Sequence, residues 1–525
     1  MNHDRVRYRF GPLERRGLVA GWRGGQIAAV AGGLLVAVLA LRSHPTPATI
    51  VVALVSVIGG LALACWPVAG RTGEEWAPTM ARWWWSAVTR TRSQRVPIPG
   101  AGHVIGPRRV PGMALAAGSA PDPKAYQETT VELRRSPFGG LALLSADSGP
   151  GGGPLGVVRD GPARTYTAVL SVRGHSFALL GPPDKERRVA EWASVLASLS
   201  RERSVIHRVQ WLAASLPDDG RAVHAHLAGR SVLSDDAPAR LSYGALLDGA
   251  GATTSRHEVL LAVQVRGAGP AARAVRAAGG GEVGGCAVVL READVLRRRL
   301  SEAGITVEGV LDPGSLAAVI RRAGDPRPSS SGRSTDTVPI GPFGSPLDRW
   351  GPRRQGWPWP LASEVRWDCL RTDGTWHATY WIAEWPRVDV GPDFLGPMLL
   401  GSVRRTVSVV MEPVNPSRAI RQVEQARTAD LADSELRRRG GFLATARRSR
   451  EEALVNRREE ELADGHASFR FSGYVTVTAP TVDLLEGACE VTEQAAGQCR
   501  LELRRLYGEQ AQGLTCTLPL GRGLS

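Results

Sequence analysis

Lysine is nearly absent from this chain. Its 525 residues include 65 lysines and arginines, of which Lys124 and Lys185 are the two lysines. A nucleotide-binding P-loop requires G-x-x-x-x-G-K-[ST], because its lysine reaches the β- and γ-phosphates. The two lysines stand in PDPKAY and PPDKER, and the glycine-rich stretch at 149–156 contains no lysine, so we interpret that stretch as a loop. The sequence therefore predicts a protein without a P-loop ATPase motor.

Cysteine is scarce as well. The six cysteines form no C-x-x-C pair, which argues against a disulfide framework or a zinc site and favours free thiols in a reducing compartment. His224 and His226 form H-A-H in a stretch with helical character, where residues two apart lie on different faces, so we interpret them as a surface pair. Motifs of the G-x-S-x-G and H-E-x-x-H types are also missing. The sequence predicts no enzyme activity, no cofactor and no metal site.

Two long apolar runs stand near the start of the chain. Ile27–Leu41 has no polar side chain, and Ala48–Trp66 is interrupted only by Thr49 and Ser56. A membrane span needs roughly 17–25 apolar residues whose backbone is satisfied internally, so the runs predict a transmembrane helical hairpin over 24–67. A cleaved signal peptide and a buried soluble hairpin are the alternatives. The second apolar run disfavours a signal peptide, and the length of the runs disfavours a soluble hairpin.

Small residues recur four apart within both apolar runs. This spacing allows two membrane helices to approach closely. We expect helix packing through Gly25, Ala29 and Gly33 in the first run and Ser56, Gly60 and Ala64 in the second.

Arginines flank the hairpin on both sides, whereas the link between its helices carries Arg42 and His44. They precede it at positions 5, 7, 9, 15, 16 and 23, and follow it at positions 71, 82, 90, 92 and 95. The positive-inside rule therefore predicts a two-span protein of the cell membrane with both termini in the cytoplasm.

A tryptophan- and arginine-rich segment follows the hairpin at 68–96. Indole rings favour the headgroup level of a bilayer while guanidinium groups stay hydrated. We therefore expect Trp76, Trp83, Trp84 and Trp85 to lie at the membrane interface; a tryptophan-rich packing helix is the alternative.

The charge of the chain leaves its other partners open. A net charge of +14 suits anionic lipid or nucleic acid. However, Arg437–Arg439 and the stretch from Arg447 to Leu462 mix with acids at helical spacing, as an exposed helix does. A second tryptophan group could fill a sheet face or stack bases, and we favour the sheet face. Its members are Trp357, Trp359, Trp367, Trp376, Trp381 and Trp385.

The remainder of the chain alternates strand and helix patterns twice over. Strands are predicted at 165–174, 205–214, 257–267 and 305–312, and again at 375–386, 405–414, 468–479 and 499–508. The order in both halves is that of a ferredoxin-like split βαβ unit, and the second half carries a long helical insertion from about Ser417 to Ala463. The fold class is thus a membrane α-helical hairpin followed by α+β, with two tandem ferredoxin-like units.

Composition places the boundaries of these parts. The predicted organisation is a basic N-terminal segment (1–23), the hairpin (24–67), an interfacial segment (68–96), a Pro/Gly linker (97–154), a first α/β unit (155–326), a second linker (327–346) and a second α/β unit (347–525).

Several motifs carry a family resemblance. They include YRFGPLERRG at the start, RTGEEWAPTMARWWW after the hairpin, and RRTVSVVMEPV and FRFSGYVTVTAP in the body. In these motifs the chain resembles actinobacterial PrgI-like membrane proteins of clusters similar to type IV (conjugation-type) secretion systems. Its body also resembles the amino-terminal non-ATPase region of conjugation ATPases, where a stretch like Thr517–Gly521 precedes the motor. The resemblance implies docking and assembly rather than hydrolysis.

These observations predict a non-catalytic, membrane-anchored structural component of a secretion or conjugative-transfer machine. We expect it to dock a separate ATPase at the cytoplasmic face and to assemble with other secretion subunits as part of an oligomer. One alternative is a subunit similar to EccE of type VII secretion, which also has a two-span hairpin and a cytosolic domain. The other is a membrane-tethered nucleic-acid-binding module.

Overall fold

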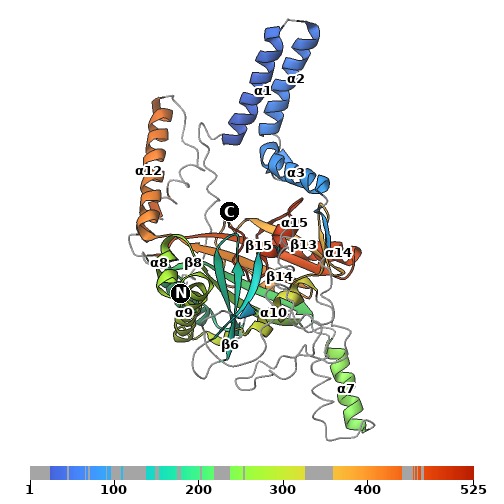
Figure 1. The fold of residues 1–525 in the computed structure, drawn as a ribbon, viewed down its shortest axis with the longest axis vertical. Helices are drawn as coiled ribbons and strands as arrows, with labels where there is room; N and C mark the ends of the chain where they lie inside the picture. The colour runs from blue at the N-terminus through green and yellow to red at the C-terminus, as the bar shows by residue number, and fades with distance from the viewer. Residues whose placement is uncertain are drawn as a thin grey trace, which may run out of the picture.

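The computed structural model describes most of the chain outside its N-terminal segment and linkers (Figure 1). The described residues are 24–43, 46–65, 67–68, 71–89, 91–95, 108–109, 138–147, 153–173, 179–201, 204–217, 237–251, 255–325, 359–439, 453, 456–457, 459–462 and 466–524.

An apolar helical hairpin extends from one end of a mixed helix and sheet body (Figure 1). Its helices are α1 (Gly24–Ser43) and α2 (Pro47–Cys65). Two short strands, β1 (Pro67–Val68) and β2 (Arg71–Thr72), then pair with each other before α3 (Gly73–Val88), which lies between the hairpin and the body. At the opposite end of the molecule, α7 (Pro238–Gly251) projects from the body.

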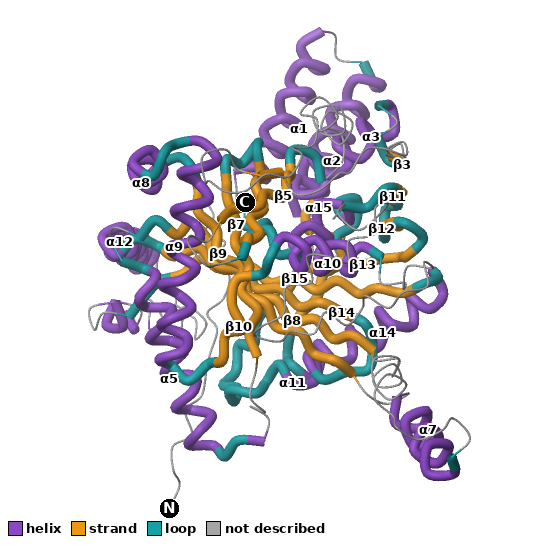
Figure 2. The backbone as a smooth tube through the Cα atoms, turned by 60° about the horizontal axis from the view of Figure 1, so that its bottom comes forward, coloured by secondary structure: helices purple, strands orange, loops and turns teal. Residues whose placement is uncertain are grey.

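One 14-stranded sheet runs through the whole body (Figure 2). The strands of its first half are β4 (Arg108–Arg109), β5 (Leu141–Asp147), β6 (Pro154–Asp160), β7 (Thr165–Arg173), β8 (Ile206–Pro217), β9 (Ser255–Arg266) and β10 (Thr306–Val310). Those of its second half are β3 (Ser93–Arg95), β11 (Ala362–Val365), β12 (Leu370–Thr372), β13 (Thr375–Glu384), β14 (Arg405–Pro413), β15 (Phe469–Ala479) and β16 (Glu502–Arg505).

The two halves repeat the same strand order. In the first half the neighbours are β8-β9-β7-β10, and in the second they are β14-β15-β13-β16. All of these neighbours pair antiparallel. The halves meet where β8 pairs antiparallel with β14, with Leu212 opposite Ser408. Two equivalent edge strands are thereby joined, and the body has one sheet rather than two.

A short hairpin precedes the first long strand of each half. Strands β5 and β6 extend the sheet beside β7, as β11 and β12 do beside β13. Strand β5 lies inside 97–154, which composition assigns to a linker. Leu141, Leu143 and Leu144 of this strand are buried, because its two faces contact helices on both sides of the sheet.

Helices cover both faces of the sheet. One face packs against α5 (Pro182–Leu199) and α9 (Gly281–Glu302) in the first half and against α11 (Gly396–Leu399) and α14 (Val482–Gln498) in the second. The centre of the other face packs against α10 (Pro313–Gly324) and α15 (Gln510–Cys516). Alternate strand residues therefore enter different cores. Leu170 of β7 is buried on the face covered by α5 and α9, and Val169 is buried on the face covered by α10 and α15.

The remaining elements are connections. A 3₁₀ turn (Gly269–Ala271) and α8 (Ala272–Ala277) precede α9, and α12 (Pro416–Arg439) lies between β14 and β15, where the helical insertion is predicted. The prediction of an apolar helical hairpin followed by an α+β body is confirmed at this level.

Candidate functional site

The two apolar helices are in backbone contact. A Cβ atom added to Gly33 would lie 2.6 Å from the carbonyl oxygen of Ser56, and one added to Gly60 would lie 2.9 Å from that of Ala29. Such distances are shorter than van der Waals contact, so glycine is required at both positions. The predicted small residues Ala29, Gly33, Ser56 and Gly60 therefore meet at the centre of the hairpin.

Gly25 and Ala64, the other two predicted packing residues, lie at the base of the hairpin. Ala64 is fully buried, and its carbonyl oxygen accepts a 2.8 Å hydrogen bond from Gln26 Nε2. Gly25 contacts α3, since a Cβ there would lie 2.0 Å from Glu74 Oε2. The carboxylate of Glu74 thus lies beside the N-terminus of α1, where a helix favours negative charge.

Both helices of the hairpin have the length and composition of membrane spans. Gly24–Arg42 and Pro47–Cys65 have 19 residues each and mean hydropathies of 2.0 and 2.5. Their outward side chains are uncovered, as Leu35 at 62% and Leu54 at 60% exposure illustrate. A core helix of a soluble protein would bury such residues. The hairpin therefore presents an apolar surface that suits lipid.

Helix α3 joins the hairpin to the body through an aromatic cluster, which we call the joint. Trp76 and Trp83 of α3 contact Trp367, with ring centroids 5.8 Å and 5.3 Å apart. Tyr507 stacks on the other side of the cluster, 6.4 Å from both Trp76 and Trp367. Aromatic pairs of this kind contribute about 0.5–1.5 kcal/mol each beyond burial. Trp76 and Trp83 are thus packed against the body and not simply placed at a membrane interface.

Gly508 allows α3 to approach the body closely. Its φ of +72° lies in the left-handed region, and a Cβ there would lie 2.7 Å from the ring of Trp367 and 3.1 Å from Cγ2 of the buried Thr79. Its amide donates a 2.6 Å hydrogen bond to the carbonyl oxygen of Trp367. Any larger residue would separate the rings.

Two arginines border the joint in different ways. Arg92 lies over Trp83, with its guanidinium carbon 3.8 Å from the ring centroid, and Nη2 donates to the carbonyl oxygen of Trp83 at 2.7 Å. Arg82 pairs with Glu509 at 2.8 Å but is 65% exposed, so its contribution is small. Directly after Arg92, β3 enters the sheet beside β11, which fixes the exit of α3.

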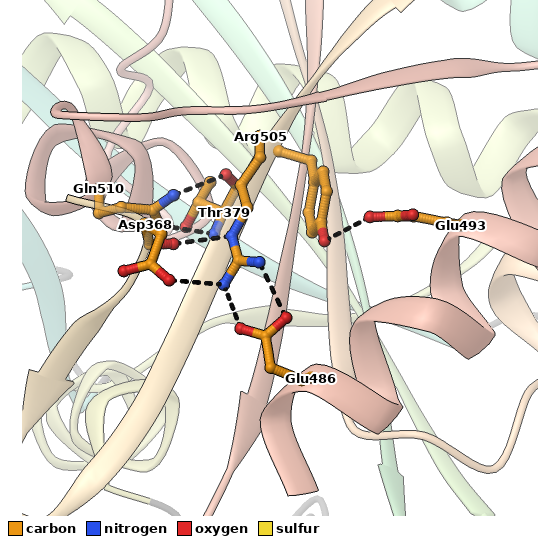
Figure 3. Close-up of polar contacts among 7 residues, drawn as sticks. Asp368, Thr379, Glu486, Glu493, Arg505 and Gln510 are labelled. Atoms are coloured by element: carbon orange, nitrogen blue, oxygen red, sulfur yellow. Dashed lines mark hydrogen bonds and ion pairs between the residues drawn. The ribbon is translucent and has the colours of Figure 1, made fainter. Parts of the chain in front are cut away.

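A polar network supports the joint from within the body (Figure 3). Arg505 donates to both carboxylate oxygens of Glu486, at 3.0 Å and 2.8 Å, and its Nε donates to the carbonyl oxygen of Asp368 at 2.8 Å. Asp368 follows Trp367, and Arg505 precedes Tyr507 by two residues. The bond from Arg505 to Asp368 therefore links the two segments that carry the aromatic rings, and the bidentate pair ties Arg505 to α14.

Further hydrogen bonds tie this network to β13. Gln510 Oε1 accepts from the amide of Thr379 at 2.8 Å, and Gln510 Nε2 donates to the carbonyl oxygen of Thr379 at 3.3 Å (Figure 3). Burial raises the pKa of Tyr380, so its hydroxyl stays protonated and donates to Glu493 Oε1 at 2.8 Å. The helices α14 and α15 are thus fixed to β13.

Outside the joint, possible metal ligands and the buried cysteines Cys286 and Cys516 are candidates for reactive chemistry. Among the residues that the structure describes, no group of three or more His, Cys, Asp or Glu could hold a metal ion. Burial raises the pKa of the Cys286 and Cys516 thiols to about 12, which keeps both protonated.

His377 is the most enclosed histidine of the second half. It is fully buried between Thr372 Oγ1, 2.6 Å from Nε2, and Thr478 Oγ1, 3.0 Å from Nδ1. Burial lowers its pKa to about 4, so the imidazole is neutral at physiological pH.

The structure divides the tryptophans predicted from the sequence. Trp84 and Trp85 are 70% and 67% exposed on α3, whereas Trp76 and Trp83 face the body. In the second group, Trp359 and Trp376 are buried. Several predicted features lie outside the described residues: Trp357, His224, His226, the basic segment 1–23 and the linker 327–346.

Sequence reasoning missed Tyr507 and Gly508 and placed Trp367 only in a general group. Trp76 and Trp367 are separated by almost three hundred positions, and no local pattern links them. Gly508, directly after Tyr507, is the one local signal of a turn before α15, because a glycine can adopt the left-handed conformation found there.

One family model matches the chain. Residues 253–382 match the model described as "Putative type VII ESX secretion system translocon, EccE". The matched residues run from β9 to β13, across the connection between the two halves, and cover about a quarter of the chain. No curated protein matches the chain.

This match overturns the predicted resemblance to PrgI-like proteins of type IV, conjugation-type clusters. The matched family belongs to type VII secretion, so the type IV interpretation of the motifs is wrong. Motifs such as RTGEEWAPTMARWWW follow from a membrane anchor with an aromatic joint, which does not specify one secretion system. The findings favour the type VII, EccE-like alternative, and together with the two candidate spans they support a membrane location.

Proposed function

We propose that this protein is an EccE-like, non-catalytic subunit of a type VII secretion machine, anchored in the membrane by α1 and α2. The EccE match carries this proposal, because it includes the body elements on both sides of the sheet connection. The joint supports it, since a fixed anchor suits a protein that positions others. The protein would contribute by positioning other subunits at the membrane, and the packing of α3 against Trp367 would hold its own body in place for that role.

The charge pattern supports an orientation with both termini in the cytoplasm. Arginines precede and follow the hairpin, whereas the link carries Arg42 and His44. The body would then lie at the cytoplasmic face. A protease added to intact cells should leave the body uncut, and cleavage of the body would contradict this orientation.

We infer that each half of the body is a ferredoxin-like unit. The strand order β8-β9-β7-β10 is the antiparallel order of that fold, and β14-β15-β13-β16 repeats it. Helices α9 and α14 occupy equivalent places, each before the last strand of its half. The union of the two units through β8 and β14 would make one elongated docking platform.

The partners that we propose are other subunits of the same machine. A separate ATPase is one of them, because neither Lys124 nor Lys185 stands in a P-loop. The hairpin would contact membrane subunits and the body would contact cytoplasmic ones, within an oligomeric assembly.

Deletion and pull-down experiments test the function. We expect deletion of the gene to abolish export of type VII substrates, and the tagged protein in mild detergent to co-purify with the membrane subunits and ATPase of that system. The Gly487→Ala variant is the control and should export and co-purify as the wild type does. Gly487 is exposed on α14, and no atom of the described structure lies within 4 Å of the added Cβ. Normal export in the deletion strain, or isolation of the protein free of these subunits, would overturn the proposal.

A further inference from the structure

Helix α3 carries a second apolar stripe, whose side chains are exposed. Thr79 is buried and Trp76 and Trp83 pack in the joint, at positions that repeat every three or four residues. The second stripe repeats with the same spacing on the opposite side of the helix. It comprises Ala77, Met80, Ala81, Trp84, Trp85 and Val88, all exposed.

This outward stripe is too apolar to be an ordinary solvent face. Met80 is 57% exposed, Val88 is 59% exposed, and the two tryptophans are more exposed still. Arg82 and Ser86 of α3 lie outside the outward stripe, and the charged Glu74 on the outward side is confined to the first turn, where it contacts Gly25 of α1. A helix of this kind has two apolar neighbours, of which the body is one.

The position of α3 identifies the second neighbour. The helix begins against the last turn of α2, because a Cβ on Gly73 would lie 2.8 Å from the side chain of Leu63 and 2.9 Å from its carbonyl oxygen. Glu74 in its first turn contacts Gly25 at the start of α1. Helix α3 then runs to one side from the base of the hairpin instead of continuing its axis (Figure 1). Its outward stripe is therefore continuous with the end of the lipid-facing surface.

We propose that the outward stripe of α3 is embedded in the boundary between headgroups and acyl chains, with Trp84 and Trp85 as its anchors. The stripe lacks charge, which suits this boundary, and indole rings favour that depth. Arg82 lies beside the stripe, where its guanidinium stays hydrated at the headgroup level. Helix α3 thus binds lipid on one side and the body on the other, and it holds the body against the bilayer.

Photo-crosslinking of the full chain tests this assignment. The photoreactive aromatic amino acid p-benzoylphenylalanine replaces Trp84, Trp85 or Trp83 in separate preparations, each reconstituted in phosphatidylglycerol and phosphatidylethanolamine vesicles. After illumination, we expect lipid adducts by mass spectrometry at positions 84 and 85. Position 83, the matched control, should instead link to the peptide that contains Trp367, since the rings of Trp83 and Trp367 are 5.3 Å apart.

Lipid adducts at position 83 equal to those at 84 and 85, or adducts at none of the three, would overturn the proposal. The same replacements in cells distinguish another occupant: an adduct of position 84 with a second protein would mean that the stripe binds a subunit. Bromine-labelled acyl chains give an independent measurement, because they should quench wild-type fluorescence more than that of the Trp84→Phe, Trp85→Phe variant.

The proposal rests on the membrane anchorage of the proposed function and not on its type VII assignment. Co-purification with type VII subunits without lipid adducts would refute the interfacial helix alone. Lipid adducts without such subunits would refute the secretion assignment alone.

Discussion

The guanidinium of Arg92 lies over the ring of Trp83 and also donates a hydrogen bond to the carbonyl oxygen of the same residue. One arginine therefore fixes both the side chain and the backbone of Trp83 from a position just beyond the end of α3. Its Nε donates in addition to Ser86 Oγ at 3.3 Å. These contacts tie the C-terminal half of α3 to the start of β3, which pairs with β11 of the body.

Substitution Arg92→Ala should loosen the joint. Loss of the cation–π contact and of both hydrogen bonds costs about 1–2 kcal/mol. Hydrogen exchange of the α3 amides in the reconstituted protein should accelerate about 5- to 30-fold. Arg82→Ala is the control, because its exposed ion pair contributes little. Equal exchange in the two variants would show that Arg92 does not hold the helix.

Gly508→Ala should separate Trp367 from α3. The added methyl group lies 2.7 Å from the Trp367 ring, and alanine is strained at a φ of +72°, so we expect destabilisation of about 1–3 kcal/mol. Thermal unfolding and tryptophan fluorescence measure the change. Gly487→Ala on α14, with open space around its Cβ, should leave stability the same or higher. A Gly508→Ala protein as stable as this control would refute the tight joint.

Two adjacent glycines of α2 should respond differently to leucine. Gly60 lies against Ala29, whereas a Cβ on Gly59 has no atom within 4 Å in the described structure. Gly60→Leu should force the helices apart, at about 1–3 kcal/mol, and Gly59→Leu should not. Cross-linking between cysteines introduced at Ala37 and Ala53, both buried in the hairpin, measures helix contact in protein whose Cys65 is replaced by serine. Equal yields in the two leucine variants would contradict the packing.

Acid should weaken the second half of the body through His377. Its pKa is about 4 in the folded protein and about 6.5 when unfolded, so below pH 6.5 the unfolded chain binds the additional proton. Stability from this group is complete above pH 6.5 and declines as the pH falls toward 4, by about 3 kcal/mol at most. Denaturant midpoints between pH 7 and 4 measure the decline. His377→Gln should flatten this dependence, and an unchanged slope would rule out His377 as its source.

Strand positions could be predicted because the alternation of apolar and polar residues is visible within a short stretch of sequence. The prediction of 375–386 corresponds to β13, Thr375–Glu384, and that of 405–414 to β14, Arg405–Pro413. The short strands β11 and β12 have too few residues to show alternation, so they were not recognised. Strand β5 was hidden by the glycine- and proline-rich residues around it.

The joint could not be predicted for a different reason. The sequence shows that α3 is rich in tryptophan, but both a bilayer and a protein core favour indole rings. The distinction between Trp83 and Trp84 depends on which side of the helix meets Trp367, a contact formed across the whole chain. Sequence resemblance also pointed to the wrong secretion system. Its anchoring motifs specify a location, and its body motifs RRTVSVVMEPV and FRFSGYVTVTAP form the strands β14 and β15, so neither kind specifies a partner.

The pairing of β8 with β14 has a mechanical consequence. A hydrogen-bonded sheet resists bending at this pairing far more than a flexible linker would, so both halves move as one lever. The joint is the fulcrum of this lever, near the base of the hairpin, and α7 projects at its far end (Figure 1). A small tilt of α1 and α2 would therefore displace both halves together, and most at the strands farthest from the joint.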